Sequence, residues 1–258
     1  MSPGSLSNRR VHAPLLSFAN VHKHRREGER ESVVLEDVCF ELQAGSALGI
    51  YGQRRSGKST LLRLAVGLEL CDGGGVRFEG RELAATSGGE RARLLRGPIA
   101  LLSVDGWLPS PGETVMDHVA MSAGSAGLSL REARRRALEA LDRAGVAGAS
   151  AEEMTVSLAP DTRARVMLAR ALVREPRLLA VDEPAPLPSL LERERFCALL
   201  REVARERSIA LLVASEELSA LQGIASLASL SAGELCSTED RGTVVEFPRR
   251  RAGAIESS

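Results

Sequence analysis

The chain has 258 residues, of which 44% are hydrophobic, so it can bury one substantial core and is not a small scaffold. Its 34 basic and 34 acidic residues cancel, so no overall charge would attract nucleic acid or an anionic membrane. No stretch reaches the roughly 18 uninterrupted apolar residues that span a bilayer, and the first residues lack the apolar centre of a secretory signal. We therefore expect a cytoplasmic protein that reaches a membrane only through a protein partner.

Both ends of the chain predict disordered tails. Residues 1–14 are polar and carry Gly, Pro and Ser, and the polar stretch 248–258 contains three consecutive arginines. The folded domain is expected over 15–247. The four cysteines are far apart in sequence and show no CxxC spacing, so we expect buried thiols rather than a zinc site or a disulfide framework.

The first third of the chain predicts strands on both sides of one helix. Residues 15–21 and 33–42 alternate apolar and polar side chains as half-buried strands do, and 47–51 form a short apolar run that ends at a glycine. A helical pattern follows over 59–70. The glycine-rich stretch 71–80 then predicts a turn that leads into another strand.

The remainder of the chain predicts an α/β fold. Residues 129–145 form an amphipathic pattern, with Ser129 and Glu132 spaced as a capping box at its start and Gly145 placed to end the helix. Further on, helices alternate with buried strands; the predicted elements are helix 162–172, strand 177–183, helix 190–206, strand 209–215 and short strands around 228–235. This alternation indicates a largely parallel sheet covered on both faces.

A phosphate-binding motif lies between the strand 47–51 and the first helix. It satisfies GxxxxGK[ST] in the strand–loop–helix context that gives the motif its meaning. Lys58 would reach the outer phosphates and Ser59 would offer its hydroxyl to magnesium. The alternative, a simple glycine turn, is disfavoured because Lys58 is one of only two lysines, and a compact ammonium fits such a loop where guanidinium does not. The predicted ATP-binding residues are Gly52, Gln53, Arg54, Arg55, Ser56, Gly57, Lys58, Ser59 and Thr60.

A second candidate site is the apolar strand that ends in Asp182 and Glu183. Strand ends of a parallel sheet point into the ligand crevice, so Asp182 would hold magnesium and Glu183 would polarise an attacking water as the catalytic residue. Taken alone, two acids at a strand end are more often a helix cap or a solvated turn. Their pairing with the phosphate-binding loop favours the functional interpretation.

The order of these motifs resembles the ATP-binding cassette (ABC) family over essentially the whole folded length. The loop is followed by a glycine turn, a helical insertion, an arginine-rich helical stretch over 162–179 and the sequence VDEP over 181–184. The resemblance implies a P-loop NTPase fold of the ABC ATPase type. This is a mixed sheet with an antiparallel strand subdomain from about the first 85 residues and a helical subdomain over about 105–165. Residues 89–102 and the long first hairpin are most similar to the branch that serves lipoprotein-releasing and macrolide-export transporters.

One surface used by this family is altered. Family members close head to tail as dimers and hold ATP between one subunit's phosphate-binding loop and the partner's LSGGQ sequence, where this chain has LAPDT over 158–162. Pro160 has no N–H to donate. Asp161 would place a carboxylate toward a triphosphate, and two like charges at about 4 Å cost on the order of 4 kcal/mol at an effective dielectric of 20. Alternatively, Asp161 is the N-cap of a helix that begins at Thr162, which also removes the free anion site.

Three loop positions also depart from the family pattern. The family's glutamine aligns with Val104 or Asp105, its aspartate after the acidic strand end aligns with Ser189, and its histidine aligns with Ser215, which lacks an imidazole to contact the γ-phosphate. The residues that bind nucleotide are thus better retained than those that support hydrolysis.

We therefore expect an ATP-binding transporter subunit that binds MgATP and hydrolyses it slowly, or only beside a partner with an intact LSGGQ sequence. Two alternatives stay open, an ordinary transport ATPase and a non-transport ATP-sensing regulatory protein. The resemblance implies an integral membrane permease as partner, a dimer with itself or with a second ABC ATPase, and a place at the inner face of the cell membrane. No nucleic acid partner is expected.

Overall fold

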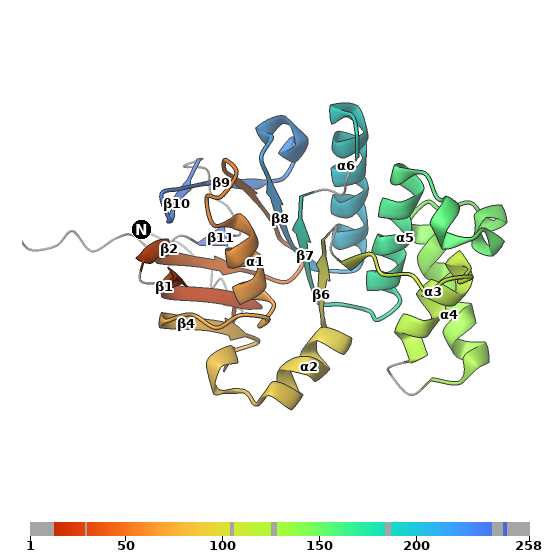
Figure 1. Cartoon of the computed structure of the whole chain (residues 1–258), viewed down its shortest axis with the longest axis horizontal. Coiled ribbons are helices and arrows are strands. Elements are labelled where there is room, and N and C mark those ends of the chain that lie inside the picture. The colour runs from red at the N-terminus through yellow and green to blue at the C-terminus, as the bar shows by residue number, and fades with distance from the viewer. Residues whose placement is uncertain are drawn as a thin grey trace, which may run out of the picture.

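The computed structural model describes residues 13–28, 30–103, 106–124, 128–183, 187–238 and 245–246. One sheet lies at one end of the molecule, the other lies near its centre, and most of the helices lie toward the opposite end (Figure 1). This arrangement agrees with the α/β fold expected from the sequence.

One sheet is antiparallel and built mainly from the first part of the chain. Phe18 and Phe40 face each other across its two long strands, with stacked rings 4.5 Å apart. The strand order is β11 (Val245–Glu246), β2 (Arg30–Leu42), β1 (Leu16–Glu27), β4 (Gly73–Phe78) and β5 (Arg81–Glu82). The expected antiparallel layer is confirmed, with the addition of β11 from near the C-terminus.

The other sheet is parallel except for one strand. Its order is β10 (Glu234–Ser237), β9 (Ser226–Ser231), β3 (Ala47–Tyr51), β8 (Ala210–Ser215), β7 (Leu178–Asp182) and β6 (Ile99–Leu102), and β10 alone of these runs antiparallel to its neighbour. Every residue of β8 is buried, as expected for a strand covered on both faces. The carboxyl ends of β3, β7 and β8 therefore meet at one edge of the sheet.

Helix α1 (Lys58–Ala65) lies between the two sheets. Its side chains Leu61, Leu62 and Leu64 are buried in a cluster with apolar residues of both sheets. The predicted helix over 59–70 is too long, because Gly67 has a φ of 75°, a left-handed conformation that ends a helix.

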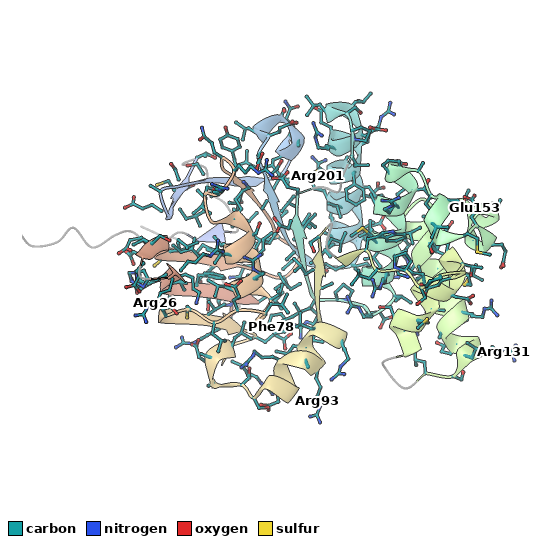
Figure 2. The ribbon with its side chains drawn as sticks, viewed as in Figure 1. Arg26, Phe78, Arg93, Arg131, Glu153 and Arg201 are labelled. Atoms are coloured by element: carbon teal, nitrogen blue, oxygen red, sulfur yellow. The ribbon has the colours of Figure 1, made fainter. Side chains whose placement is uncertain are left out.

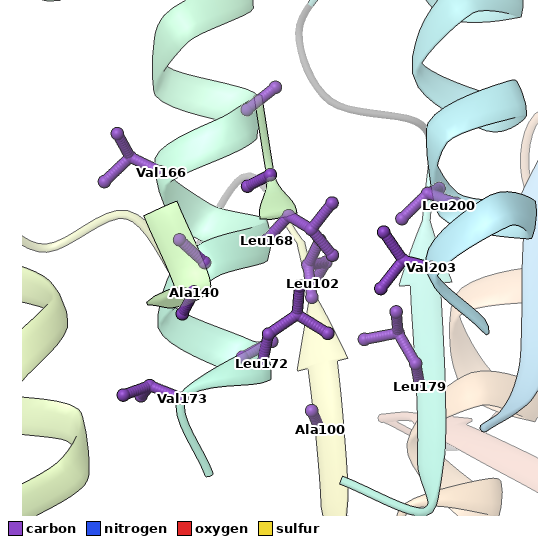
Figure 3. Packing of buried hydrophobic residues seen from close by; sticks show 14 of the residues in the cluster. Ala100, Leu102, Ala140, Val166, Leu168, Leu172, Val173, Leu179, Leu200 and Val203 are labelled. Carbon is purple, nitrogen blue, oxygen red and sulfur yellow. The ribbon is translucent and has the colours of Figure 1, made fainter. Parts of the chain in front are cut away.

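The opposite face of the parallel sheet is covered by α5 (Pro160–Leu172) and α6 (Leu190–Glu206). Successive residues of a strand point to opposite faces, so Leu179 of β7 joins this second cluster whereas its neighbour Leu178 faces α1. Figure 3 shows Leu179 opposite Leu200 and Val203 of α6. A single hydrophobic cluster thus extends from the sheet through α5 into the helical region.

The helical region contains α3 (Val115–Gly124), α4 (Leu130–Arg143) and the short turns η3 (Gly148–Glu152) and η4 (Thr155–Ser157). Helices α3 and α4 lie against each other and against α5, and η3 lies against α3 and α4. The hydroxyl of Ser129 caps α4 as predicted, but the carboxylate of Glu132 pairs with Arg135 and Arg136 instead of returning to the N-cap. Gly145, at a φ of 69°, follows the helix end as predicted.

The remaining short elements lie nearer the sheets. They are η1 (Leu83–Ala85), α2 (Gly88–Arg96) and η5 (Leu218–Leu221). Helix α2 was not predicted from periodicity, because it buries none of its residues and depends on a capping box at Ser87.

Most charged side chains, Lys58 excepted, lie on the outside of the molecule. Figure 2 shows Arg26, Arg93, Arg131 and Glu153 at its periphery, whereas Phe78 is 2% exposed in the core. No helix in the described part of the chain is long and apolar enough to cross a membrane.

Candidate nucleotide-binding site

The phosphate-binding loop joins β3 to α1 and has a backbone that only glycine tolerates at two points. A Cβ on Gly52 would lie 2.5 Å from Ser56 Oγ and 2.6 Å from the carbonyl oxygen of Leu230. Gly57 has a φ of 104°, and a Cβ there would lie 2.8 Å from the carbonyl oxygen of Val34. The loop therefore needs both motif glycines to pack closely against neighbouring backbone.

The ammonium of Lys58 is held inside this loop. Lys58 is 6% exposed, and its Nζ donates to the carbonyl oxygens of Gly52 at 2.7 Å and Gln53 at 3.0 Å. Both acceptors are neutral, and the first turn of α1 contains no acidic residue. A buried cation at the positive end of a helix, bonded to neutral groups, favours binding of an anion.

The remaining polar groups of the loop also fit a phosphate. Ser56 Oγ is buried without a hydrogen-bond partner among the described residues, and such a group is normally satisfied by a ligand or by water. No side chain caps α1, so the N–H groups at its start stay available. The residues present therefore fit a nucleotide phosphate.

Ser59 and Asp182 meet although they are 123 positions apart in sequence. Ser59 lies in the first turn of α1 and Asp182 ends β7, and the hydroxyl of Ser59 donates to Oδ1 of Asp182 at 3.1 Å. A hydroxyl and a carboxylate are oxygen ligands of the kind that Mg²⁺ prefers. This pair could hold the magnesium ion of MgATP.

Glu183 follows in a strained backbone conformation, with a φ of 53°. Its Oε1 accepts the N–H of Glu216 at 2.8 Å, and its Oε2 accepts the hydroxyl of Ser215 at 3.2 Å. Burial raises the pKa of Glu183, while the ammonium of Lys58 and these two hydrogen bonds oppose the rise. A carboxylate with a raised pKa near a buried ammonium is suited to accept a proton from water.

Ser215 occupies the position where the resemblance implies a histidine. Its side chain is fully buried, and its hydroxyl also accepts the N–H of Glu217 at 3.1 Å. The group expected to contact the γ-phosphate is thus replaced by one that holds Glu183.

The predicted N-cap role of Asp161 is wrong. Helix α5 begins two residues before Thr162, with Ala159 as N-cap and Pro160 at the first helical position. Asp161 is then one residue inside the helix, where Oδ2 accepts from Nε of Arg165 at 2.9 Å, one turn further on. The helix start has no side-chain cap, and the carboxylate that was expected to repel nucleotide is paired with a guanidinium.

Of the other positions that depart from the family pattern, the structure describes only Ser189. Val104 and Asp105 lie outside the described residues. Ser189 forms a full capping box with Glu192 at the start of α6. Where the family has an aspartate, this serine caps the start of the helix.

Sequence reasoning missed the turn that borders the loop from the other side. Residues 229–232, at the end of β9, line a depression of about 380 Å³ together with Tyr51 and residues 52–56. No local motif marks residues 229–232, because only the pairing of β9 with β3 brings them there.

Comparison with known proteins places this geometry in a family. A family model described as ABC transporter matches residues 35–186. The lipoprotein-releasing system ATP-binding protein LolD of Pseudomonas syringae is 32% identical over 222 residues, which cover 86% of this chain and 96% of that protein. The methionine import ATP-binding protein MetN of Rhizobium etli is 34% identical over 202 residues, and the match spans only 55% of that protein.

Solved structures agree on the fold. The dimeric structure of MJ0796, a bacterial ABC transporter cassette, superimposes with a TM-score of 0.78 at 24% identity, covering 91% of this chain and 99% of that one. The structure of cbiO1 from Clostridium perfringens, part of the ABC transporter complex cbiONQ, superimposes with a TM-score of 0.74 at 23% identity and covers 87% of each chain. The ABC ATPase fold, with its antiparallel strand subdomain and helical subdomain, is confirmed.

Proposed function

The chain belongs to the ABC transporter family, and on this premise we propose that it is a transporter subunit that binds MgATP at the site of Lys58, Ser59 and Asp182 and turns it over slowly. The observation that carries the proposal is the hydrogen bond between Ser59 and Asp182 beside the buried ammonium of Lys58. It joins two motifs, far apart in sequence, that together suit a nucleotide and its metal ion.

Each residue of the site has a distinct role in this proposal. Lys58 neutralises the outer phosphates, while the backbone N–H groups at the start of α1 surround them. Ser59 and Asp182 hold magnesium, which when bound neutralises phosphate charge. Glu183 accepts the proton of an attacking water.

Slow turnover follows from what the site lacks. Ser215 cannot supply the imidazole that the family resemblance implies at the γ-phosphate, and its hydroxyl is already engaged with Glu183. Pro160 offers no N–H toward a nucleotide bound by a second subunit. The pairing of Asp161 with Arg165 weakens the electrostatic repulsion expected there, so the lost donors are the main reason for slow turnover.

The partners are proposed from the relatives. A LolD protein is 32% identical to this chain and is matched over 96% of its length, which supports the lipoprotein-releasing branch that residues 89–102 resemble. The chain spans about half of the methionine import protein that it also matches. The partners would be an integral membrane permease and a second cassette, either a copy of this chain or another ABC ATPase. The chain would then lie at the inner face of the membrane.

Calorimetry tests the binding proposal. MgATP should bind with a dissociation constant between micromolar and millimolar, and Asp182→Asn should weaken MgATP binding more than binding of ATP in the presence of EDTA. Asp142→Asn, a substitution of an exposed acid on α4, is the matched control and should change neither. Absence of any binding heat at millimolar ATP would refute the proposal.

Phosphate release tests the turnover proposal. The purified protein should release phosphate slowly, and Glu183→Gln should abolish this phosphate release. Brisk release by the protein alone, lost in Glu183→Gln, would instead favour an ordinary transport ATPase. Binding without any turnover, alone or beside a candidate partner cassette, would favour the ATP-sensing alternative.

A further inference from the structure

We infer that Arg193 is a positioning residue for Glu183, which it holds in place through Glu217 and Ser215. The inference rests on the proposed role of Glu183 as the proton acceptor. Arg193 lies in the first turn of α6. The two hydrogen bonds of the Glu183 carboxylate come from Ser215 and Glu216, not from Arg193.

Arg193 joins the two chain segments that meet at Glu183. Its Nη1 donates to the carbonyl oxygen of Leu187, four residues after Glu183, at 2.7 Å. Its Nη2 donates to both carboxylate oxygens of Glu217 at 2.8 and 2.9 Å. One guanidinium therefore ties the segment that follows β7 to the segment that follows β8.

The second segment is the one that holds the carboxylate of Glu183. The N–H of Glu217 donates to Ser215 Oγ, Ser215 Oγ donates to Glu183, and the N–H of Glu216 donates to the other oxygen of Glu183. The three donors of these hydrogen bonds belong to three consecutive residues, 215–217. A displacement of Glu217 would therefore shift both hydrogen-bond donors of Glu183.

This external support matters because Glu183 is strained. A left-handed glutamate persists only where its surroundings fix it. The Arg193 side chain is 21% exposed and Glu217 is 45% exposed, so the pair is partly shielded from water. A partly exposed ion pair contributes little to stability through charge alone. The pair of Arg193 and Glu217 matters here because it fixes the geometry of residues 215–217.

Three variants of the full chain test the assignment by two measurements. Arg193→Ala and Glu217→Ala each break the pair, and Arg193→Lys keeps the charge. Arg195→Ala, an exposed arginine on the same helix, is the matched control. The first measurement is single-turnover phosphate release at excess protein, with Glu183→Gln as background. The second is amide hydrogen exchange at Glu216 and Glu217.

We expect Arg193→Ala and Glu217→Ala each to slow phosphate release by about tenfold, within the roughly hundredfold that small misplacements can cost. The affinity for MgATP should not change, and the double variant should be no slower than the slower single variant. Arg193→Lys should recover part of the rate. Exchange at Glu216 should rise by roughly threefold or more in both alanine variants, and Arg195→Ala should match the unaltered protein.

Two results would overturn the assignment. One is phosphate release by Arg193→Ala at the unaltered rate. The other is an unchanged amide exchange rate at Glu216 in Arg193→Ala. This second measurement alone tests the assignment if the unaltered protein releases no more phosphate than Glu183→Gln. A failure of MgATP to bind would instead count against the proposed function, because the exchange measurement needs no nucleotide.

Discussion

Replacing Lys58 by alanine should weaken MgATP binding without unfolding the protein. Lys58 is only 6% exposed, so nucleotide binding requires little further desolvation of its side chain. Its two hydrogen bonds to the carbonyl oxygens of Gly52 and Gln53 would be exchanged for bonds to anionic oxygens. The net gain is about that of one charge-assisted hydrogen bond, about 1.5–3 kcal/mol, which corresponds to a roughly 10- to 150-fold rise in Kd.

Calorimetry of Lys58→Ala beside Arg54→Ala measures this difference. Arg54 lies in the same loop with an exposed side chain, so its loss should raise Kd by less than about fivefold. A thermal melt confirms that both variants are folded. If Lys58→Ala binds MgATP within twofold of the unaltered protein, the argument from the buried ammonium is wrong.

Three further predictions concern stability. Gly57→Ala places a Cβ against the carbonyl oxygen of Val34 at a positive φ, so urea unfolding should show a loss of about 1–3 kcal/mol; an unchanged midpoint would mean that the loop relaxes freely. Burial lowers the pKa of His118, whose Nδ1 pairs with Glu113, so the folded protein favours the neutral ring. The free energy of unfolding should therefore fall as the pH drops below about 6.5, the usual pKa of histidine in the unfolded chain. Urea unfolding at pH 7.5 and 5.5 should show this loss, and His118→Gln should show less of it; equal pH dependence in both would contradict the assignment. Ser189→Ala removes the N-cap of α6 and should cost about 1 kcal/mol by thermal or urea unfolding, whereas no loss would mean that the capping box contributes nothing.

The parts of the site that were predictable are those with a local pattern or a general rule of topology. The loop over 52–60 is a continuous motif, so its residues could be named directly. The meeting of Asp182 with Ser59 follows from the rule that parallel strands end at one edge of the sheet, although 123 positions separate the two residues.

Other features had no such pattern. The contact of Ser215 with Glu183 depends on the pairing of β7 with β8, and a serine alone does not reveal its partner. Asp161 was assigned to a cap because aspartate favours that position, but a proline at the first helical position moved the helix start and left Arg165 as a better partner. Local preference was overridden there by the neighbouring residue.

The short strand β11 has a practical consequence for any shortened form of this protein. Val245 and Glu246 pair with Leu42 and Glu41 at the outer edge of β2. An uncovered strand edge offers free N–H and C=O groups to which another chain can add, and such edges promote aggregation. A protein truncated before Val245 should therefore be more prone to self-association than one that ends after Glu246, even though the nucleotide site would be intact in both.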